Sequence, residues 1–228
     1  MTNGLTWIGA HAHTATPVPG MRGGISLTLA RGIDPDEFLI NLGADLDQLA
    51  ARTPLAELRS QPTPLAELRS QPTPPGHDPT RYAYAMYGSE GEWTYVLEND
   101  HAATWATGFR RVPSMRPGPG EEILCASRNL YSPPAAMLHV EGDEVIRRAE
   151  FGTTTGHESA LDAALTAAGA VFPSIPDATA DEVTAYYEQH GARLPTLVFT
   201  ALGAYTGLSI DQDAAQAGNL PAVHLLTP

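Results

Sequence analysis

The sequence predicts an α+β fold, in which a central, mainly antiparallel sheet (a meander) packs against C-terminal helices. Two observations lead to this prediction. Between Glu92 and Phe151, short apolar segments alternate with turn residues such as Gly142, which is typical of strands joined by tight turns. After Thr155 the apolar residues recur with helical spacing instead. A short strand–helix unit is expected before the sheet.

The N-terminal part divides into a lead-in and the beginning of a single domain. Residues 1–24 are rich in proline and glycine, so we expect a flexible lead-in, followed by one α+β domain over residues 25–228. Ile25–Ala30 alternates apolar and hydroxyl residues and predicts a half-buried strand. Asp34 then predicts a helix N-cap, with Pro35 in the first turn and Gly43 after the last turn.

The strands of the sheet are expected where apolar residues lie between turn residues. They are Arg81–Tyr87, Glu92–Leu97, Ala103–Gly108, Glu122–Arg128, Ala135–Val140 and Glu144–Phe151. Three helices should follow. Capping boxes predict the first to begin near Thr155–Glu158 and the second near Thr179–Glu182, and the third should begin at Pro195 and end before Gly207.

A proline-rich insert at residues 53–75 contains an exact duplication. Thr53–Pro62 reads TPLAELRSQP, and Thr63–Pro72 repeats it without a change. Each LAELRS could form one or two helical turns, so the pair could present two short docking helices. We favour a tandem duplication that lengthens a surface loop, because longer loops cost little closure entropy.

The composition limits the classes of function. The chain has 228 residues and a formal net charge of −13, and all 13 basic residues are arginine. This acidic balance argues against nucleic-acid binding, which needs clustered cations. Cys125 is the single cysteine, so an intrachain disulfide is impossible. With no signal-like or membrane-spanning apolar run, the sequence predicts an acidic cytoplasmic protein without a membrane partner.

Few residues suggest chemistry. His11 and His13 form the most metal-like pair, but no third ligand accompanies them, so we predict neither a metal site nor a cofactor. Cys125 lies within a predicted strand, where a buried structural cysteine is more common than a nucleophile. No Gly-rich phosphate loop, nucleophile elbow or calcium loop is complete in the sequence.

One polar cluster remains as a candidate ligand-binding site. Glu98, Arg128, Asn129 and Tyr131 all fall at the ends of predicted central strands, where polar groups can converge on a sheet surface. Ordinary turn chemistry explains the same residues, since Asn and Asp commonly end strands. The catalytic residues, if there are any, stay unknown at this stage.

The chain resembles an uncharacterised actinobacterial family, a domain of unknown function. The resemblance spans roughly residues 25–215 and rests on SLTLARGIDPDEFLINLGAD, EWTYVLEND, CASRNLYSPPAAMLHVEGDEVIRRAEF and ALGAYTGLSI. It implies that Trp93, Glu98 and Asn129 correspond to recurring positions of the family, but it implies no activity. The HAH-containing lead-in and the duplicated insert depart from the family pattern.

Two function hypotheses follow. The first is a non-catalytic, cytoplasmic binding or interaction module whose partner is an unknown protein or small molecule, and the sequence leaves a homo-oligomer open. The second is a small-molecule hydrolase or transferase that uses Glu98 as general base and Arg128 as anion clamp, with Asn129 beside them.

Overall fold

The computed structural model describes residues 4–10, 24–61, 78–99, 117–129, 136–142, 144–150, 159–170 and 179–227. The helices are α1 Thr6–Ala10, α2 Pro35–Asn41, α3 Leu46–Ala51, α4 Leu55–Leu58, α7 Ala160–Ala167, α8 Ala180–His190, α9 Leu194–Thr206 and α10 Gln212–Ala217. The strands are β1 Gly24–Arg31, β2 Asp78–Glu90, β3 Trp93–Asn99, β4 Glu122–Asn129, β5 Ala136–Glu141, β6 Glu144–Glu150 and β7 Ala222–Thr227.

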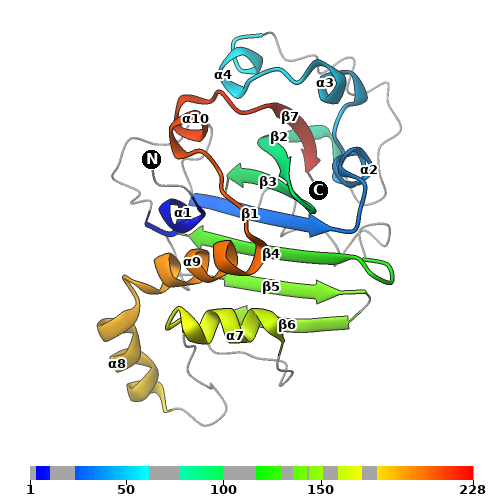
Figure 1. Cartoon of the computed structure of the whole chain (residues 1–228). Coiled ribbons are helices and arrows are strands. Elements are labelled where there is room, and N and C mark those ends of the chain that lie inside the picture. The colour runs from blue at the N-terminus through cyan, green and yellow to red at the C-terminus, as the bar shows by residue number, and fades with distance from the viewer. Residues whose placement is uncertain are drawn as a thin grey trace.

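The strands form one sheet in the order β6-β5-β4-β1-β3-β2-β7, and each neighbouring pair is antiparallel. The predicted α+β class with an antiparallel sheet is therefore confirmed (Figure 1). Two residues separate β2 from β3, and two separate β5 from β6, as expected for strands joined by tight turns. The strand of the short strand–helix unit predicted before the sheet is β1, which pairs with β3 and β4 at the centre of the sheet.

β1 is buried on both faces, whereas its alternating sequence predicted a half-buried strand. Seven of its eight residues are buried, including Thr28 on one face and Leu29 on the other. The prediction was wrong because the hydroxyl-bearing face is also covered by protein. Ala30, for example, packs in the apolar cluster that contains Phe38 and Leu39 of α2.

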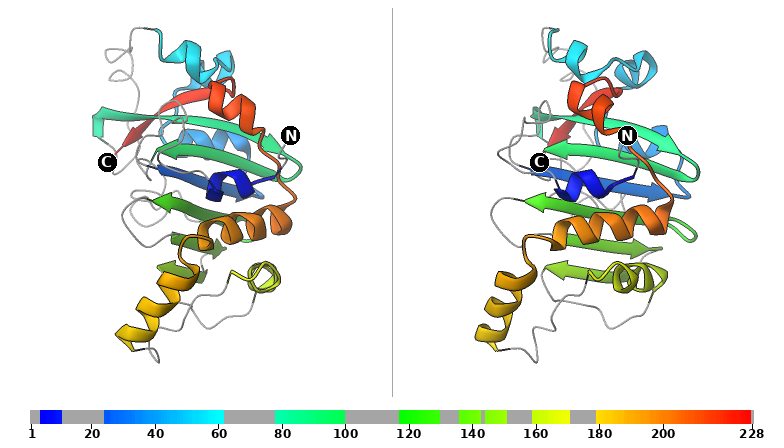
Figure 2. Two further views of the ribbon diagram at one scale, coloured as in Figure 1. Left: turned by 90° about the vertical axis from the view of Figure 1, so that its left-hand side faces the viewer. Right: turned by 60° about the vertical axis from the view of Figure 1, so that its left-hand side comes forward.

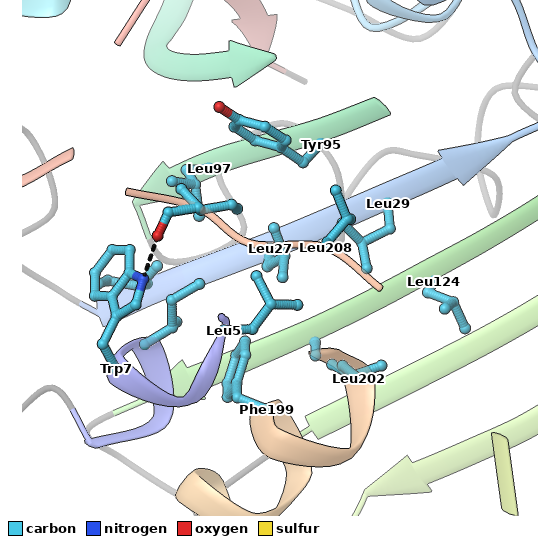
Figure 3. Packing of buried hydrophobic residues seen from close by; sticks show 14 of the residues in the cluster. Leu5, Trp7, Leu27, Leu29, Tyr95, Leu97, Leu124, Phe199, Leu202 and Leu208 are labelled. Carbon is cyan, nitrogen blue, oxygen red and sulfur yellow. Dashed lines mark hydrogen bonds between the residues drawn. The ribbon is translucent and has the colours of Figure 1, made fainter. Parts of the chain in front are cut away.

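Helices α1, α7 and α9 cover the face of the sheet that carries Leu27 and Leu29 (Figures 1 and 2). Figure 3 shows this core from close by, with Phe199 of α9 beside Leu5 and with the Trp7 indole donating a 3.0 Å hydrogen bond to the Ile210 carbonyl. The expectation of a flexible lead-in is wrong for residues 4–10. Their apolar side chains are buried because α1 docks against α9.

The opposite face is packed by α2 and α3, and the segment from α2 to α4 also covers the outer edge of β7. Ala44 pairs with Leu225, and Gln48 Oε1 accepts a 2.8 Å hydrogen bond from the His224 backbone N–H. An uncovered edge strand invites pairing with other chains. The sequence analysis missed β7, and with it the role of this segment as an edge cover.

The first copy of the duplicated segment belongs to the core and is no surface loop. Leu55 and Leu58 of α4 are buried, and the backbone around them bonds to residues 218–222. One or two helical turns were considered there, but their burial was not predicted, because their partners at residues 218–222 lie far away in the sequence. The second copy, residues 63–72, lies outside the described residues, as does the strand predicted at Ala103–Gly108.

The helix ends test the capping predictions. Asp34 accepts hydrogen bonds from the backbone N–H groups of Asp36 and Glu37, and Thr179 and Glu182 form the expected capping box. The first C-terminal helix begins later than predicted, at a capping box between Ser159 and Asp162. None of the helices in the described ranges is long and apolar enough to cross a membrane.

Candidate functional site

The buried carboxylate of Glu122 lies beneath α9, at the level where β1 ends and β4 begins. Register places Arg31 of β1 between Trp93 of β3 and Glu122 of β4, so these three side chains belong to one cross-strand row. His139 reaches the carboxylate from β5, and Tyr205 reaches it from α9. We call these five residues the Glu122 centre.

Both carboxylate oxygens of Glu122 are in close contact with other side chains, although the contacts with Arg31 and His139 lack hydrogen-bond geometry. Oε1 accepts a 2.8 Å hydrogen bond from the Tyr205 hydroxyl and lies 2.7 Å from His139 Nε2. Oε2 lies 2.5 Å from a guanidinium nitrogen of Arg31. The same guanidinium is stacked on Trp93, with Cζ 5.1 Å from the ring centroid. Glu122 and His139 are each 1% exposed, whereas the Arg31 side chain is 38% exposed, so the centre meets solvent through arginine.

The electrostatics of the centre favour one protonation state. Burial acts to raise the pKa of Glu122, but the contacts with His139, Tyr205 and Arg31 outweigh burial and lower it. For Tyr205, burial and the hydrogen bond to the carboxylate both raise the pKa. Near neutral pH the centre therefore holds an ionised glutamate and a protonated phenol.

This geometry suits a structural link better than acid–base catalysis. A general base needs a lone pair that a substrate proton can reach. The Glu122 oxygens already contact three side chains, and His139 Nδ1 is buried without a hydrogen-bond partner among the described residues. The centre thus fastens α9 to β1, β4 and β5 through charge-assisted contacts.

A second polar group lies on the opposite face, toward the other end of the strands. Ser26 of β1 pairs with Glu98 on one side and with Ser127 on the other, and we call these three residues the polar row. Each is at most 2% exposed, and Ser127 Oγ has no hydrogen-bond partner among the residues that the structure describes. Buried hydroxyls are rarely left in that state, because desolvation costs about 1–3 kcal/mol.

Cys125 lies in the next cross-strand row, where the Thr28 hydroxyl donates to its sulfur at 3.5 Å. Burial raises the pKa of the Cys125 thiol to about 12, with a further contribution from the charge of Glu98. A thiolate nucleophile needs the opposite shift. The prediction of a buried structural cysteine is consistent with this environment.

The predicted site residues do not form one cluster. Glu98 lies in the polar row, but Trp93 lies in the Glu122 centre, five residues away along the same strand and on the other face. Arg128 and Asn129 are the last two residues of β4, and register pairs them with Ile25 and Gly24. The side chains of these two residues, and all of Tyr131, His11 and His13, lie outside the described residues.

The sequence analysis missed the residues that complete both groups. Arg31, Glu122 and His139 each lie in a predicted strand or directly after one, and Tyr205 lies in the helix predicted to begin at Pro195. Only register could have shown that the four meet, and register was not predictable without knowing that β1 lies between β3 and β4.

Comparison of the chain with protein-family models, with curated proteins and with solved structures gives no match. The resemblance to an uncharacterised actinobacterial family therefore stays a prediction.

Proposed function

We propose that the chain is a non-catalytic binding module that encloses a small polar ligand at the polar row. The observation that carries the proposal is the buried Ser127 hydroxyl, which has no hydrogen-bond partner within the described part of the chain, although Ser26 is next to it and Glu98 lies one strand further along the same row. A ligand that offers hydrogen-bond donors would satisfy this hydroxyl and would lie in the same row as the Glu98 carboxyl group, a further acceptor.

The pKa values of the buried ionisable groups support a binding module over an enzyme. The buried ionisable groups with resolved shifts are held away from neutral pKa values: Cys125 is raised to about 12, and His224 is lowered to about 4. General acid–base catalysis works best with a pKa near the operating pH. The expected location is the cytoplasm, where a lone thiol such as Cys125 stays reduced.

Native mass spectrometry of the protein purified from its own host tests the proposal. We expect the native mass to exceed the denatured mass by the mass of one small molecule. That excess should disappear in Ser127→Ala and Glu98→Gln. It should persist in Ser89→Ala, a control at an exposed position near the far end of the same face.

Three results would contradict the proposal. A native mass equal to the denatured mass would show that the purified protein holds no ligand. Turnover of a substrate that Glu98→Gln abolishes without loss of stability would instead support the hydrolase or transferase hypothesis, with Arg128→Ala as the companion variant. If a protein partner is retained and still binds to the Ser127→Ala variant, the binding surface lies outside the polar row.

A further inference from the structure

Helix α8 lies apart from the sheet. Figures 1 and 2 show it extending from the start of α9 away from the strands. In the described part of the chain, α9 packs against α1, α7 and β4, and α8 is not among these packing partners. The helix thus projects from the body of the molecule, to which its C-terminal end is joined through α9.

The sequence of α8 divides the helix into two faces. The α8 side chains that the structure describes are all exposed, and they belong to Ala180, Asp181, Glu182, Thr184, Ala185, Glu188 and Gln189. The other positions recur at i, i+3, i+4 and i+7, so they share one face of the helix. They are Val183, Tyr186, Tyr187 and His190, and we call them the α8 stripe. An amphipathic helix that projects in this way is suited to docking against another protein surface.

The two ends of α8 carry opposite charges. Asp181 and Glu182 lie in the first turn, whereas Arg193 follows the last turn. Asp181 and Arg193 are both exposed, and neither forms a salt bridge with a described residue. The helix is therefore complementary in charge to a second copy of itself that runs in the opposite direction.

One antiparallel register of two α8 helices brings the two stripes together. When Val183 lies level with His190 of the second copy, Tyr186 lies level with Tyr187, and both relations repeat about a two-fold axis. Stripe then faces stripe along the whole helix. Because such an arrangement uses the same surface on both copies, no second kind of surface is needed.

The same register also pairs the charges. The acidic first turn of each helix lies level with residues 191–193 of the other copy, and Glu188 lies level with Ala185, so no two carboxylates are opposed. In a parallel pair, Asp181, Glu182 and Glu188 would each lie beside their own copies, and like charges repel. The opposed helix dipoles add to the preference for the antiparallel pair.

We propose that α8 is a self-association element of this protein. The α8 stripes of two copies pack antiparallel about a two-fold axis between Tyr186 and Tyr187, and Asp181 of each copy pairs with Arg193 of the other. The helix has 11 residues and is about 16 Å long, so the interface is small and the dimer exchanges with the monomer. Repulsion between copies of net charge −13 weakens the dimer further, although salt at about 0.15 M screens charges more than about 8 Å apart.

Sedimentation velocity of the full chain, at concentrations from about 5 to about 500 µM in that salt, tests the proposal. We expect a monomer–dimer equilibrium that is half complete at a concentration on the order of 10–100 µM. Tyr186→Ser with Tyr187→Ser should raise this concentration by at least about tenfold, because the centre of the interface is lost. Gln189→Ala is the control on the exposed face of α8 and should leave it unchanged.

A charge-reversal series tests the register. Asp181→Arg and Arg193→Asp should each weaken the dimer by about threefold or more, because each sets like charges against one another. The two substitutions combined in one chain should restore the dimer. Asp181 and Arg193 of one chain lie at opposite ends of a helix about 16 Å long, so the recovery reports a contact between copies. This series decides the case even where the tyrosine variant loses helix α8.

Three outcomes would overturn the proposal. A chain that stays monomeric over the whole concentration range does not associate through α8. A dimer that neither the tyrosine variant nor the charge reversals weaken uses another surface. If the combined charge reversal fails to restore a dimer that both single reversals weaken, the helices do not pair in the antiparallel register.

Discussion

An ionised carboxylate costs several kcal/mol to bury unless nearby groups compensate for lost water. Glu122 is compensated by Arg31, His139 and Tyr205, and it thereby joins three strands to α9. A network of this kind is strong only while it is complete, because removing one member leaves the others buried without a partner.

Glu122→Gln should therefore destabilise the protein by about 2–3 kcal/mol, less than for a fully buried pair because Arg31 is partly exposed. Urea unfolding at pH 7 measures this. Glu141→Gln is the matched control, since Glu141 pairs with Glu122 in the register but is exposed, and it should change stability by less than about 0.5 kcal/mol. Equal effects of the two substitutions would mean that the Glu122 centre adds no stability.

His224 predicts how stability depends on pH. Burial lowers its pKa from 6.5 to about 4, although the charge of Asp45 opposes the shift. The unfolded chain then binds a proton between pH 6.5 and pH 4 that the folded chain does not, so stability falls as the pH drops through this window. The expected loss is on the order of 2 kcal/mol.

His224→Phe checks this, because phenylalanine retains a ring between Tyr82 and Tyr84 but cannot titrate. The free energy of unfolding of the variant should vary less than that of wild type between pH 6.5 and pH 4. Protonation of Glu122, whose pKa is lowered in the folded protein, causes a separate loss of stability below about pH 4.5 in both wild type and the variant. An unchanged slope in the variant would assign the pH dependence to other groups.

At the scale of elements, local sequence patterns predicted most helices and strands, because caps and turns are local. Asp34, Thr179 and Gly207 each end or begin a helix where their chemistry indicates. What could not be predicted were α1, α4 as a core element, and β7. Their burial depends on partners about 140 to 200 residues away in the sequence, such as β2 for β7 and Ile210 for Trp7.

The same limit applies to the candidate site. Glu98 was identified because it ends a strand, but its neighbours Ser26 and Ser127 become relevant only through register. Trp93 was grouped with Glu98 by family resemblance, and alternation along β3 separates them. A single sequence carries the strand pattern but not the pairing of strands.

The contact between α1 and α9 depends on the absence of a side chain at Gly9. A Cβ atom there would overlap the Pro195 carbonyl, so Gly9→Ala should displace α1 and cost about 2 kcal/mol. Gly203→Ala is the contrasting control. Its Cβ would lie 3.5 Å from the Leu5 backbone nitrogen, and alanine favours the helix by up to about 1 kcal/mol. Thermal unfolding should show opposite shifts, and a tolerated Gly9→Ala would show that α1 is loosely docked.

At the scale of the whole molecule, helices pack on both faces of the sheet, and the central strands are the best-covered part. Ile25 and Leu97 on one face and Val96 on the other are at most 1% exposed. Cys125 lies on β4 beside β1, at 2% exposure, in the cluster that α2 completes. Reaching its sulfur from solvent requires the sheet or its covering helices to open.

The thiol of Cys125 should therefore report global unfolding. Burial and a pKa raised to about 12 should together make labelling by a thiol reagent at pH 8 slower than for a free cysteine by at least about 10⁴-fold, the ratio expected for 5 kcal/mol or more of stability. The logarithm of the labelling rate should rise with urea concentration with the same slope as the logarithm of the unfolding equilibrium constant. Glu122→Gln should accelerate labelling by the same factor by which it raises that equilibrium constant.

Leu46→Cys provides the control, because it adds a thiol at a position that is 58% exposed and should be labelled at once. A slow rate that does not change with urea would instead reveal a local opening at the polar row, and a ligand enclosed there should then slow the labelling further.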